Sequence, residues 1–186
     1  MPVRRFLNRF KHRERDTMRV LGIDPGYAIV GWGVVEYAGN RFAPIAYGAV
    51  CTDKDTPFEQ RLIEIYDGIK DICTRYQPEA LSIEKLYYQH NQTTVIGVAE
   101  ARGVLLLAAE QQGVPVFSYT PLQVKSAVVG YGNATKHQVQ DMTKRLLHLS
   151  AVPKPDDAAD ALALALCHAR SFTSRLPQMV DVKETV

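Results

Sequence analysis

The chain has little cysteine and no long apolar run, and each shortage excludes a class of protein. Its three cysteines, Cys51, Cys73 and Cys167, are widely spaced and odd in number, so they indicate neither a disulfide framework nor a metal-binding cluster. This usage is typical of a reducing compartment, and we expect a cytoplasmic protein. No run of about 18 uncharged apolar residues occurs, so no membrane-spanning helix is expected.

A strong excess of one charge is also lacking, because the net charge of the 186 residues is only +2. Residues 1–16 carry six basic and two acidic side chains, which leaves a net charge of −2 for the rest. Any nucleic-acid-binding surface must therefore be local. Residues 1–17 are interpreted as a flexible basic arm. A transit peptide, an over-long start before Met18 and an arm that touches phosphates all stay open.

The length and the 46% hydrophobic content fit one folded domain, which we place at residues 18–171, followed by a disordered tail at 172–186. Hydrophobic periodicity and turn signals predict strands at 19–26, 28–37, 42–52, 79–84 and 114–120. They predict helices at 58–76, 91–112, 121–129, 136–149 and 156–170. Helical crossovers make the first, fourth and fifth strands parallel, and early hairpins add an antiparallel half. The fold class is α/β: a five-stranded mixed sheet with helices on both faces.

The last segment, 156–170, carries two conflicting signals. Leu162, Leu164 and Leu166 alternate as they would in a strand. The segment is nevertheless rich in alanine and leucine, lacks β-branched residues, and follows a proline with Asp156 at the cap position. Helix propensity and capping outweigh the alternation, so a helix is predicted.

Two acidic residues stand at the ends of apolar strands. Asp24 ends the first strand and is held extended by Pro25, and Glu84 ends the fourth strand. If these strands are parallel neighbours, both carboxylates leave the sheet at the same edge. Neighbouring strands lie about 4.8 Å apart, so one cation can contact both side chains there. Each acid alone could instead cap a helix or pair with a lysine such as Lys85. The pair at matched positions favours metal binding, because a divalent ion removes the cost of two buried like charges.

Two further acids, Asp157 and Asp160, lie three residues apart at the start of the last predicted helix. This spacing puts them on one helix face. Acids at a helix N-terminus are also favoured by the helix dipole, and Asp156 fits that explanation as the N-cap. Asp160, however, lies within an alanine- and leucine-rich run that should be buried. The alanines let this helix approach the sheet closely and bring its acids toward the strand ends.

Four carboxylates without a histidine or cysteine cluster form an all-oxygen set of ligands. Such a set favours hard cations, so we expect Mg²⁺ or Mn²⁺. Two ions about 3.5–4 Å apart would suit phosphoryl chemistry, in which one activates water and the other stabilises the leaving 3′ oxygen. The carboxylates would hold the ions, and Asp157 could also orient the water.

Several segments, in this order, resemble the RuvC family of Holliday-junction resolvases in the RNase H-like superfamily. They are LGIDPG, GWG, LSIEKLYY, QVKSAVVGYGNATKHQVQDM and DDAADALALAL, and they span roughly residues 18–170. The resemblance implies an RNase H-like sheet of strand order 3-2-1-4-5. It also implies four metal-binding acids at Asp24, Glu84, Asp157 and Asp160. Some members have histidine at the third position, where this chain has aspartate.

The resemblance also implies roles in DNA contact. Lys125 and Lys136 match lysines near the scissile phosphate, and Tyr87 matches an aromatic residue that stacks on bases of the opened junction. Many relatives have phenylalanine there. Asn91 lies in the following loop, and Tyr88 beside Tyr87 suits base stacking as well. From the residues alone, the lysines could equally be solvated and the tyrosines could pack on the core.

The implied activity is a metal-dependent endonuclease that cuts two opposing strands of a four-way junction and leaves 5′ phosphates. Two cuts call for a two-fold homodimer, for which the apolar helix at 91–112 is the expected interface. Junction-migration machinery of the RuvA–RuvB type is the implied partner. Two other functions stay open: a kinase or ATPase of the actin-like type, and a non-catalytic junction-binding module.

Overall fold

The structure is a computed structural model, and it describes residues 17–86 and 95–173. Its strands are β1 (Thr17–Asp24), β2 (Ile29–Ala38), β3 (Arg41–Cys51), β4 (Ala80–Glu84) and β5 (Val116–Tyr119). Its helices are α2 (Phe58–Tyr76), α3 (Val95–Gln111), α4 (Pro121–Val129), α5 (Lys136–Leu146) and α6 (Asp156–Thr173). The predicted elements are confirmed in number, type and order over these residues, with ends that differ by a few residues.

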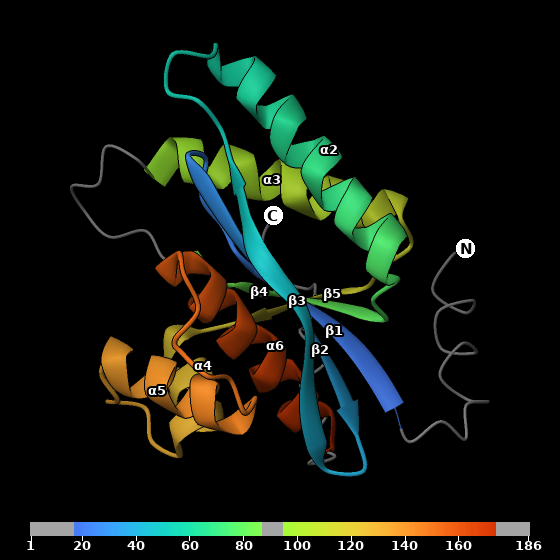
Figure 1. Ribbon diagram of the computed structural model, residues 1–186. Coiled ribbons are helices and arrows are strands. Elements are labelled where there is room, and N and C mark those ends of the chain that lie inside the picture. Colours follow the sequence, from blue (N-terminus) through green and yellow to red (C-terminus); the bar gives the residue numbers. More distant parts are fainter. Residues whose placement is uncertain (1–16, 87–94, 174–186) are drawn as a thin grey trace, which may run out of the picture.

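The five strands form one mixed sheet of order β3-β2-β1-β4-β5 (Figure 1). β1 pairs with β2, and β2 with β3, in antiparallel fashion, whereas β4 lies parallel to both β1 and β5. Gly39 and Asn40 form the two-residue turn between β2 and β3, and both have positive φ, as a primed hairpin turn requires. The predicted strand order and directions are therefore confirmed.

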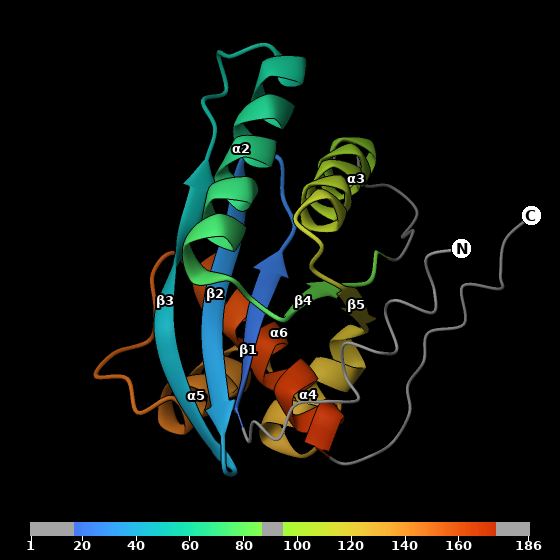
Figure 2. The same ribbon diagram turned by 90° about the vertical axis from the view of Figure 1, so that its right-hand side faces the viewer.

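Helices cover both faces of the sheet. α2 and α3 lie side by side on one face, and α4, α5 and α6 lie on the other (Figures 1 and 2). Successive residues of β1 point to opposite faces, so Leu21 and Ile23 pack under α2 and α3 while Val20 packs under α6. The sheet thus separates two apolar cores, as expected for an α/β layer fold.

The last helix, α6, is the structural centre of its layer. Every residue from Ala161 to Ala169 is buried, which explains the conflicting signals in the sequence. The alternating leucines belong to a helix that contacts protein on all sides, so no polar face imposes a helical period. The backbone carbonyl of Leu164 even accepts a hydrogen bond from the buried Ser82 hydroxyl of β4, at 2.7 Å.

Two predicted boundaries shift slightly. Thr17, assigned to the arm, is the first residue of β1, and α6 continues to Thr173, beyond the expected end of the domain at residue 171. The rest of the arm and of the tail lies outside the described residues. Among the helices of residues 17–86 and 95–173, none combines the length and apolar character needed to cross a membrane.

Candidate metal-binding active site

The strand-end acids lie side by side. β1 and β4 run parallel with Ile23 opposite Ile83, and Asp24 and Glu84 follow these two residues directly. Both side chains therefore leave the sheet at the carboxyl edge, from neighbouring strands about 4.8 Å apart. This is the edge at which open α/β sheets bind ligands.

Helix α6 brings the other two acids to this edge because glycines in the sheet let its backbone rest directly on the strands. A Cβ added to Gly22 would lie 1.9 Å from the Ala161 carbonyl oxygen, and one added to Gly31 would lie 2.1 Å from the Asp157 carbonyl oxygen. Gly31 is the register partner of Asp24, so Asp157 sits over the end of β1. The sequence prediction credited the alanines of α6, but the glycines opposite them are equally necessary.

The acids lie close enough for their charges to act on one another. Burial, followed by the negative charges of Asp160, Glu84 and Asp157, raises the pKa of Asp24 from 3.8 to about 7. Burial and the charge of Asp160 also raise the pKa of Glu84. The structure therefore places all four predicted acids in one electrostatic group, drawn from β1, β4 and α6.

Lys136 is the cation of this group. Its Nζ atom lies 2.8 Å from Oδ2 of Asp160, and this hydrogen bond raises the lysine's pKa. The pKa of Asp160 is nevertheless raised as well, because burial outweighs the lysine's effect. Lys136 begins α5, where Thr135 and Gln138 form a reciprocal capping box that fixes the helix start.

Lys125 approaches the group from α4, on the side of Glu84. Its positive charge partly offsets the rise in the pKa of Glu84, so the two side chains interact electrostatically. α4 is also anchored by a capping box, between Thr120 and Gln123. The two lysines singled out in the sequence thus lie next to different acids, Lys125 next to Glu84 and Lys136 next to Asp160.

Other sequence predictions have different outcomes. Asp156 is the first residue of α6 rather than the residue before it, and its carboxylate accepts a hydrogen bond from Lys154 at 2.7 Å. Its negative charge still contributes to raising the pKa values of Lys136 and Asp160. Tyr87, Tyr88 and Asn91 lie outside the described residues. The adjoining chain is described up to Leu86, whose side chain is exposed.

Sequence reasoning did not single out Arg102. This half-buried arginine of α3 donates from Nε to the backbone carbonyl of Glu84 at 3.3 Å and from a terminal nitrogen to Ser118 Oγ at 3.0 Å. It therefore ties the ends of β4 and β5 together beneath Glu84. The sequence feature that could have indicated Arg102 is that it is the one basic residue in the apolar stretch 95–111.

The donor set fits a hard divalent cation, because all four candidate ligands are carboxylates. Within the described stretches, no three acidic, histidine or cysteine side chains stand in an arrangement that could hold a metal ion as they are. Mutual repulsion keeps such carboxylates apart, and a bound cation removes it. The side chains of Asp24, Glu84 and the α6 acids would have to move closer together for their oxygens to share one ion.

Comparison with known proteins identifies relatives over most of the chain. The family model described as "Crossover junction endodeoxyribonuclease RuvC" matches residues 20–168. A protein of that name from Caldanaerobacter subterraneus is 57% identical over 154 residues, which are 83% of this chain and 93% of the relative.

Two solved structures of Thermus thermophilus RuvC are also similar to this chain. One, of the protein alone, has 35% identity and a TM-score of 0.78, and the other, in complex with a Holliday junction substrate, has 36% identity and a TM-score of 0.80. Each match covers 84% of this chain and 96% of the solved chain.

Proposed function

Because the chain belongs to the RuvC family of crossover junction endodeoxyribonucleases, we propose that its four clustered carboxylates form the active site that resolves four-way DNA junctions. The observation that carries this assignment is the convergence of Asp24, Glu84, Asp157 and Asp160 from three elements into one electrostatic group. The family membership also speaks against an actin-like kinase and against a non-catalytic binding module.

The carboxylates would hold two divalent cations, Mg²⁺ or Mn²⁺, which supply activation of the attacking water and stabilisation of the leaving 3′ oxygen. Burial and the neighbouring acids raise the pKa of Asp24 to about 7, and its carboxyl group would be deprotonated in order to hold a cation. Asp157 would also orient the water. Cleavage of two opposing strands would leave 5′ phosphates.

The two lysines would contact the phosphate backbone beside the acids. Lys136 is more than half exposed although it pairs with Asp160, so it can exchange this carboxylate for a phosphate oxygen when a cation neutralises the acids. Lys125 is half-buried next to Glu84. We retain base stacking by Tyr87 and Tyr88, and DNA contact by Asn91, as proposals from the family resemblance.

A two-fold homodimer would supply the two active sites that paired cleavage needs. α3 supports this proposal because it is apolar on both sides. Its inner side buries Ala101 and Leu105, while Ile96 and Leu107 of the same helix are 73% and 53% exposed. Light scattering that detects only monomers at working concentration would contradict this interface.

Three further assignments complete the proposal. The expected division into a basic arm, a nuclease domain and a tail is kept, with the domain extended to run from Thr17 to Thr173. Its partners include a junction-migration complex of the RuvA–RuvB type, as the family resemblance implies. We place its action in the cytoplasm, a setting that suits the three free cysteines of the chain.

A cleavage assay tests the central assignment. A synthetic four-way junction and a linear duplex of the same sequence are incubated with each metal, alongside the Asp24→Asn variant. We expect wild-type protein to cut only the junction, and Asp24→Asn to bind it without cutting, because the substitution removes a metal ligand and a charge that repels phosphate. Equal cutting of the duplex would contradict junction selectivity, and normal cleavage by Asp24→Asn would show that the site is misplaced.

A further inference from the structure

Arg61, on the sheet-facing side of α2, is a buried arginine that lies outside the acid group. It is only 7% exposed and occupies the buried stripe of the helix one turn before Ile65. Its guanidinium donates from Nε to Thr52 Oγ1 at 2.8 Å and from a terminal nitrogen to the backbone carbonyl of Tyr27 at 3.0 Å. The same group lies 4.9 Å from the centre of the Tyr27 ring.

The partners of this buried cation are all neutral. Among the described residues, no carboxylate lies within ion-pair distance of Arg61, and its contacts are a carbonyl, a hydroxyl and a ring face. A buried charge without an opposite charge destabilises the fold, and it would destabilise the fold more if its hydrogen bonds were removed. The arginine therefore performs a task that an apolar residue in the same stripe would not.

The contacts of Arg61 converge on one loop. Tyr27 lies three residues after Asp24, in the short connection between β1 and β2. Its carbonyl also accepts a hydrogen bond from Thr52 Oγ1 at 2.7 Å, and Thr52 N donates to the Ala28 carbonyl at 3.0 Å. The carbonyls of Tyr27 and Ala28 in this connection thus accept hydrogen bonds from Thr52, which follows β3, and from Arg61 of α2.

The Tyr27 ring also contacts both helices on this face of the sheet, α2 and α3. It packs edge-on against Phe58 of α2, with the ring centres 5.8 Å apart. A Cβ added to Gly97 in the first turns of α3 would lie 3.2 Å from the ring, so α3 contacts it closely. One turn of backbone after Asp24 therefore joins β1, the end of β3, α2 and α3.

We propose that Arg61 is a positioning residue which, through the carbonyl and ring of Tyr27, fixes the direction in which Asp24 presents its carboxylate to a metal ion. This inference rests on the proposed metal-dependent function. The planar fork of arginine reaches the hydroxyl, the carbonyl and the ring face together, whereas the three donors of a lysine ammonium all leave from one nitrogen atom and lack this planar spread. The charge alone is therefore insufficient for this role.

The test compares Arg61→Met, which keeps the bulk of the side chain, with Arg19→Met as a matched control. Arg19 is a second arginine that donates to a backbone carbonyl, at the opposite end of β1. Mn²⁺ binding is measured by electron paramagnetic resonance of the free ion, and cleavage by single-turnover rates on a four-way junction. Junction affinity and the unfolding midpoint are measured in parallel.

We expect Arg61→Met to weaken Mn²⁺ binding and to slow cleavage by roughly 10–100-fold, the range typical of residues that orient metal ligands. Junction affinity should stay within about twofold, because Arg61 does not contact DNA in this proposal, and excess Mn²⁺ should restore part of the rate. Arg61→Lys should recover little. Arg19→Met should lower the unfolding midpoint yet bind Mn²⁺ and cleave like wild type.

Three outcomes would overturn the inference. The first is an Arg61→Met variant that loses only thermal stability, as Arg19→Met does. The second is full recovery by Arg61→Lys. The third is a wild-type protein that neither binds Mn²⁺ nor cuts junctions, which would overturn the proposed function as well and so is distinguishable from the other two. If Arg61→Met does not fold, Thr52→Val, which removes the hydroxyl bonded to both Arg61 and Tyr27, decides between the same alternatives.

Discussion

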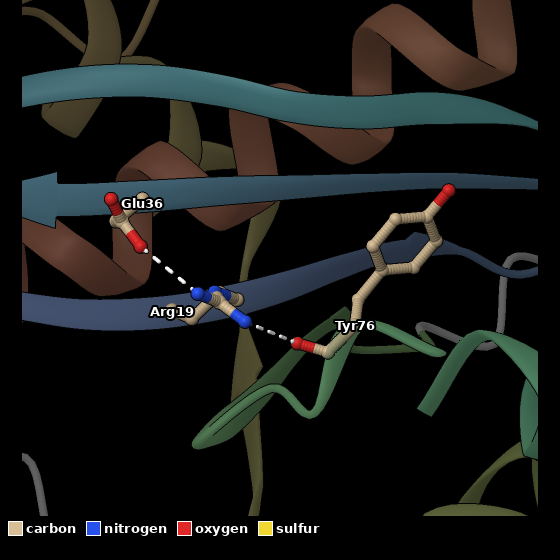
Figure 3. Close-up of polar contacts among 3 residues, drawn as sticks. All are labelled: Arg19, Glu36 and Tyr76. Carbon is tan, nitrogen blue, oxygen red and sulfur yellow. Dashed lines mark hydrogen bonds and ion pairs between the residues drawn. The ribbon is translucent and has the colours of Figure 1, made fainter. Parts of the chain in front are cut away.

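The two ends of β1 hold charge in opposite ways. At its first residues, Arg19 donates to the Tyr76 carbonyl at 2.9 Å and pairs with Glu36 of β2 at 3.2 Å, so a positive and a negative charge meet across neighbouring strands (Figure 3). At its last residue, Asp24 meets three further acids and one lysine. The contacts of Arg19 connect neighbouring elements with balanced charge, whereas the Asp24 end carries an excess of negative charge.

The two arrangements also differ in their energetic sign. The Arg19–Glu36 pair is more than a third exposed on each side, and pairs of this kind stabilise a fold by about 0–1 kcal/mol. Asp24, by contrast, destabilises the folded chain once it ionises, since burial and the neighbouring acids raise its pKa from the ordinary value of 3.8 to about 7. At about 1.4 kcal/mol per pKa unit, this cost is about 4 kcal/mol.

Removal of the Asp24 charge should therefore have the largest effect, in two directions at once. Asp24→Asn should lose cleavage and, in the presence of a chelator, gain thermal stability. A carboxyl group whose pKa is raised in the fold loses stability as the pH rises from about 4 through 7, so the gain should be small near pH 4 and full at pH 8. Thermal unfolding with EDTA across this pH range measures it, and a stability difference that does not grow with pH would contradict the raised pKa that burial and the neighbouring acids give Asp24.

The sequence could predict this contrast in part. Asp24 and Glu84 are visible because an acid at the end of an apolar strand is unusual, and the helix at 156–170 followed from composition despite its alternating leucines. Gly22 and Gly31 could not be interpreted in the same way. The space that a glycine leaves has meaning only when the segment that fills it, here the backbone of α6, is known.

Arg61 was hidden for a different physical reason. On a helical projection it falls on the same face as Ile65 and Ile69, where a long charged side chain is usually read as one that reaches solvent. Its acceptors come from Tyr27 and Thr52, which are far from it in sequence. Such contacts follow from tertiary packing and leave no local pattern.

A change in the packing between α6 and the sheet should disrupt the acid group at the end of β1 without a change of charge. Gly31→Ala would push a Cβ into the Asp157 carbonyl. No side-chain rotation can relieve this contact with backbone atoms, so the start of α6 as a whole must shift. A shift of about 1 Å should slow cleavage about 100-fold, with a stability loss of about 1–3 kcal/mol. Single-turnover cleavage and urea unfolding measure the two effects.

Gly103→Ala is the control for stability alone, since a Cβ at Gly103 of α3 meets nothing within 4 Å, while the residue lies on the exposed side of the proposed dimer helix. It should stabilise the helix by about 0.5–1 kcal/mol. If Gly31→Ala cleaves like the wild-type protein, the close contact between α6 and β2 does not position Asp157.

Loss of a single neighbouring cation should have a smaller effect than either change. Lys125→Ala removes the positive charge that lowers the pKa of Glu84 and a candidate phosphate contact. We expect cleavage to slow about tenfold, equivalent to about 1.4 kcal/mol. The exposed Lys70 of α2, on the other face of the sheet, provides the control, and equal rates for Lys125→Ala and Lys70→Ala would reduce Lys125 to a surface residue.

The smallest effect on cleavage should come from the opposite end of β1, where the pair Arg19–Glu36 allows a double-mutant cycle. Glu36→Gln should cost less than about 1 kcal/mol because the pair is exposed. Arg19→Met should cost about 1–3 kcal/mol, since it also leaves the Tyr76 carbonyl without this donor. Urea unfolding of the two single variants and the double variant gives the coupling energy, and neither single variant should change the cleavage rate. A coupling energy above about 2 kcal/mol would contradict the weak contribution expected of an exposed pair. Slower cleavage by either single variant would mean that the two ends of β1 are not separable. The charge balance at its first residues would then belong to the active site as well.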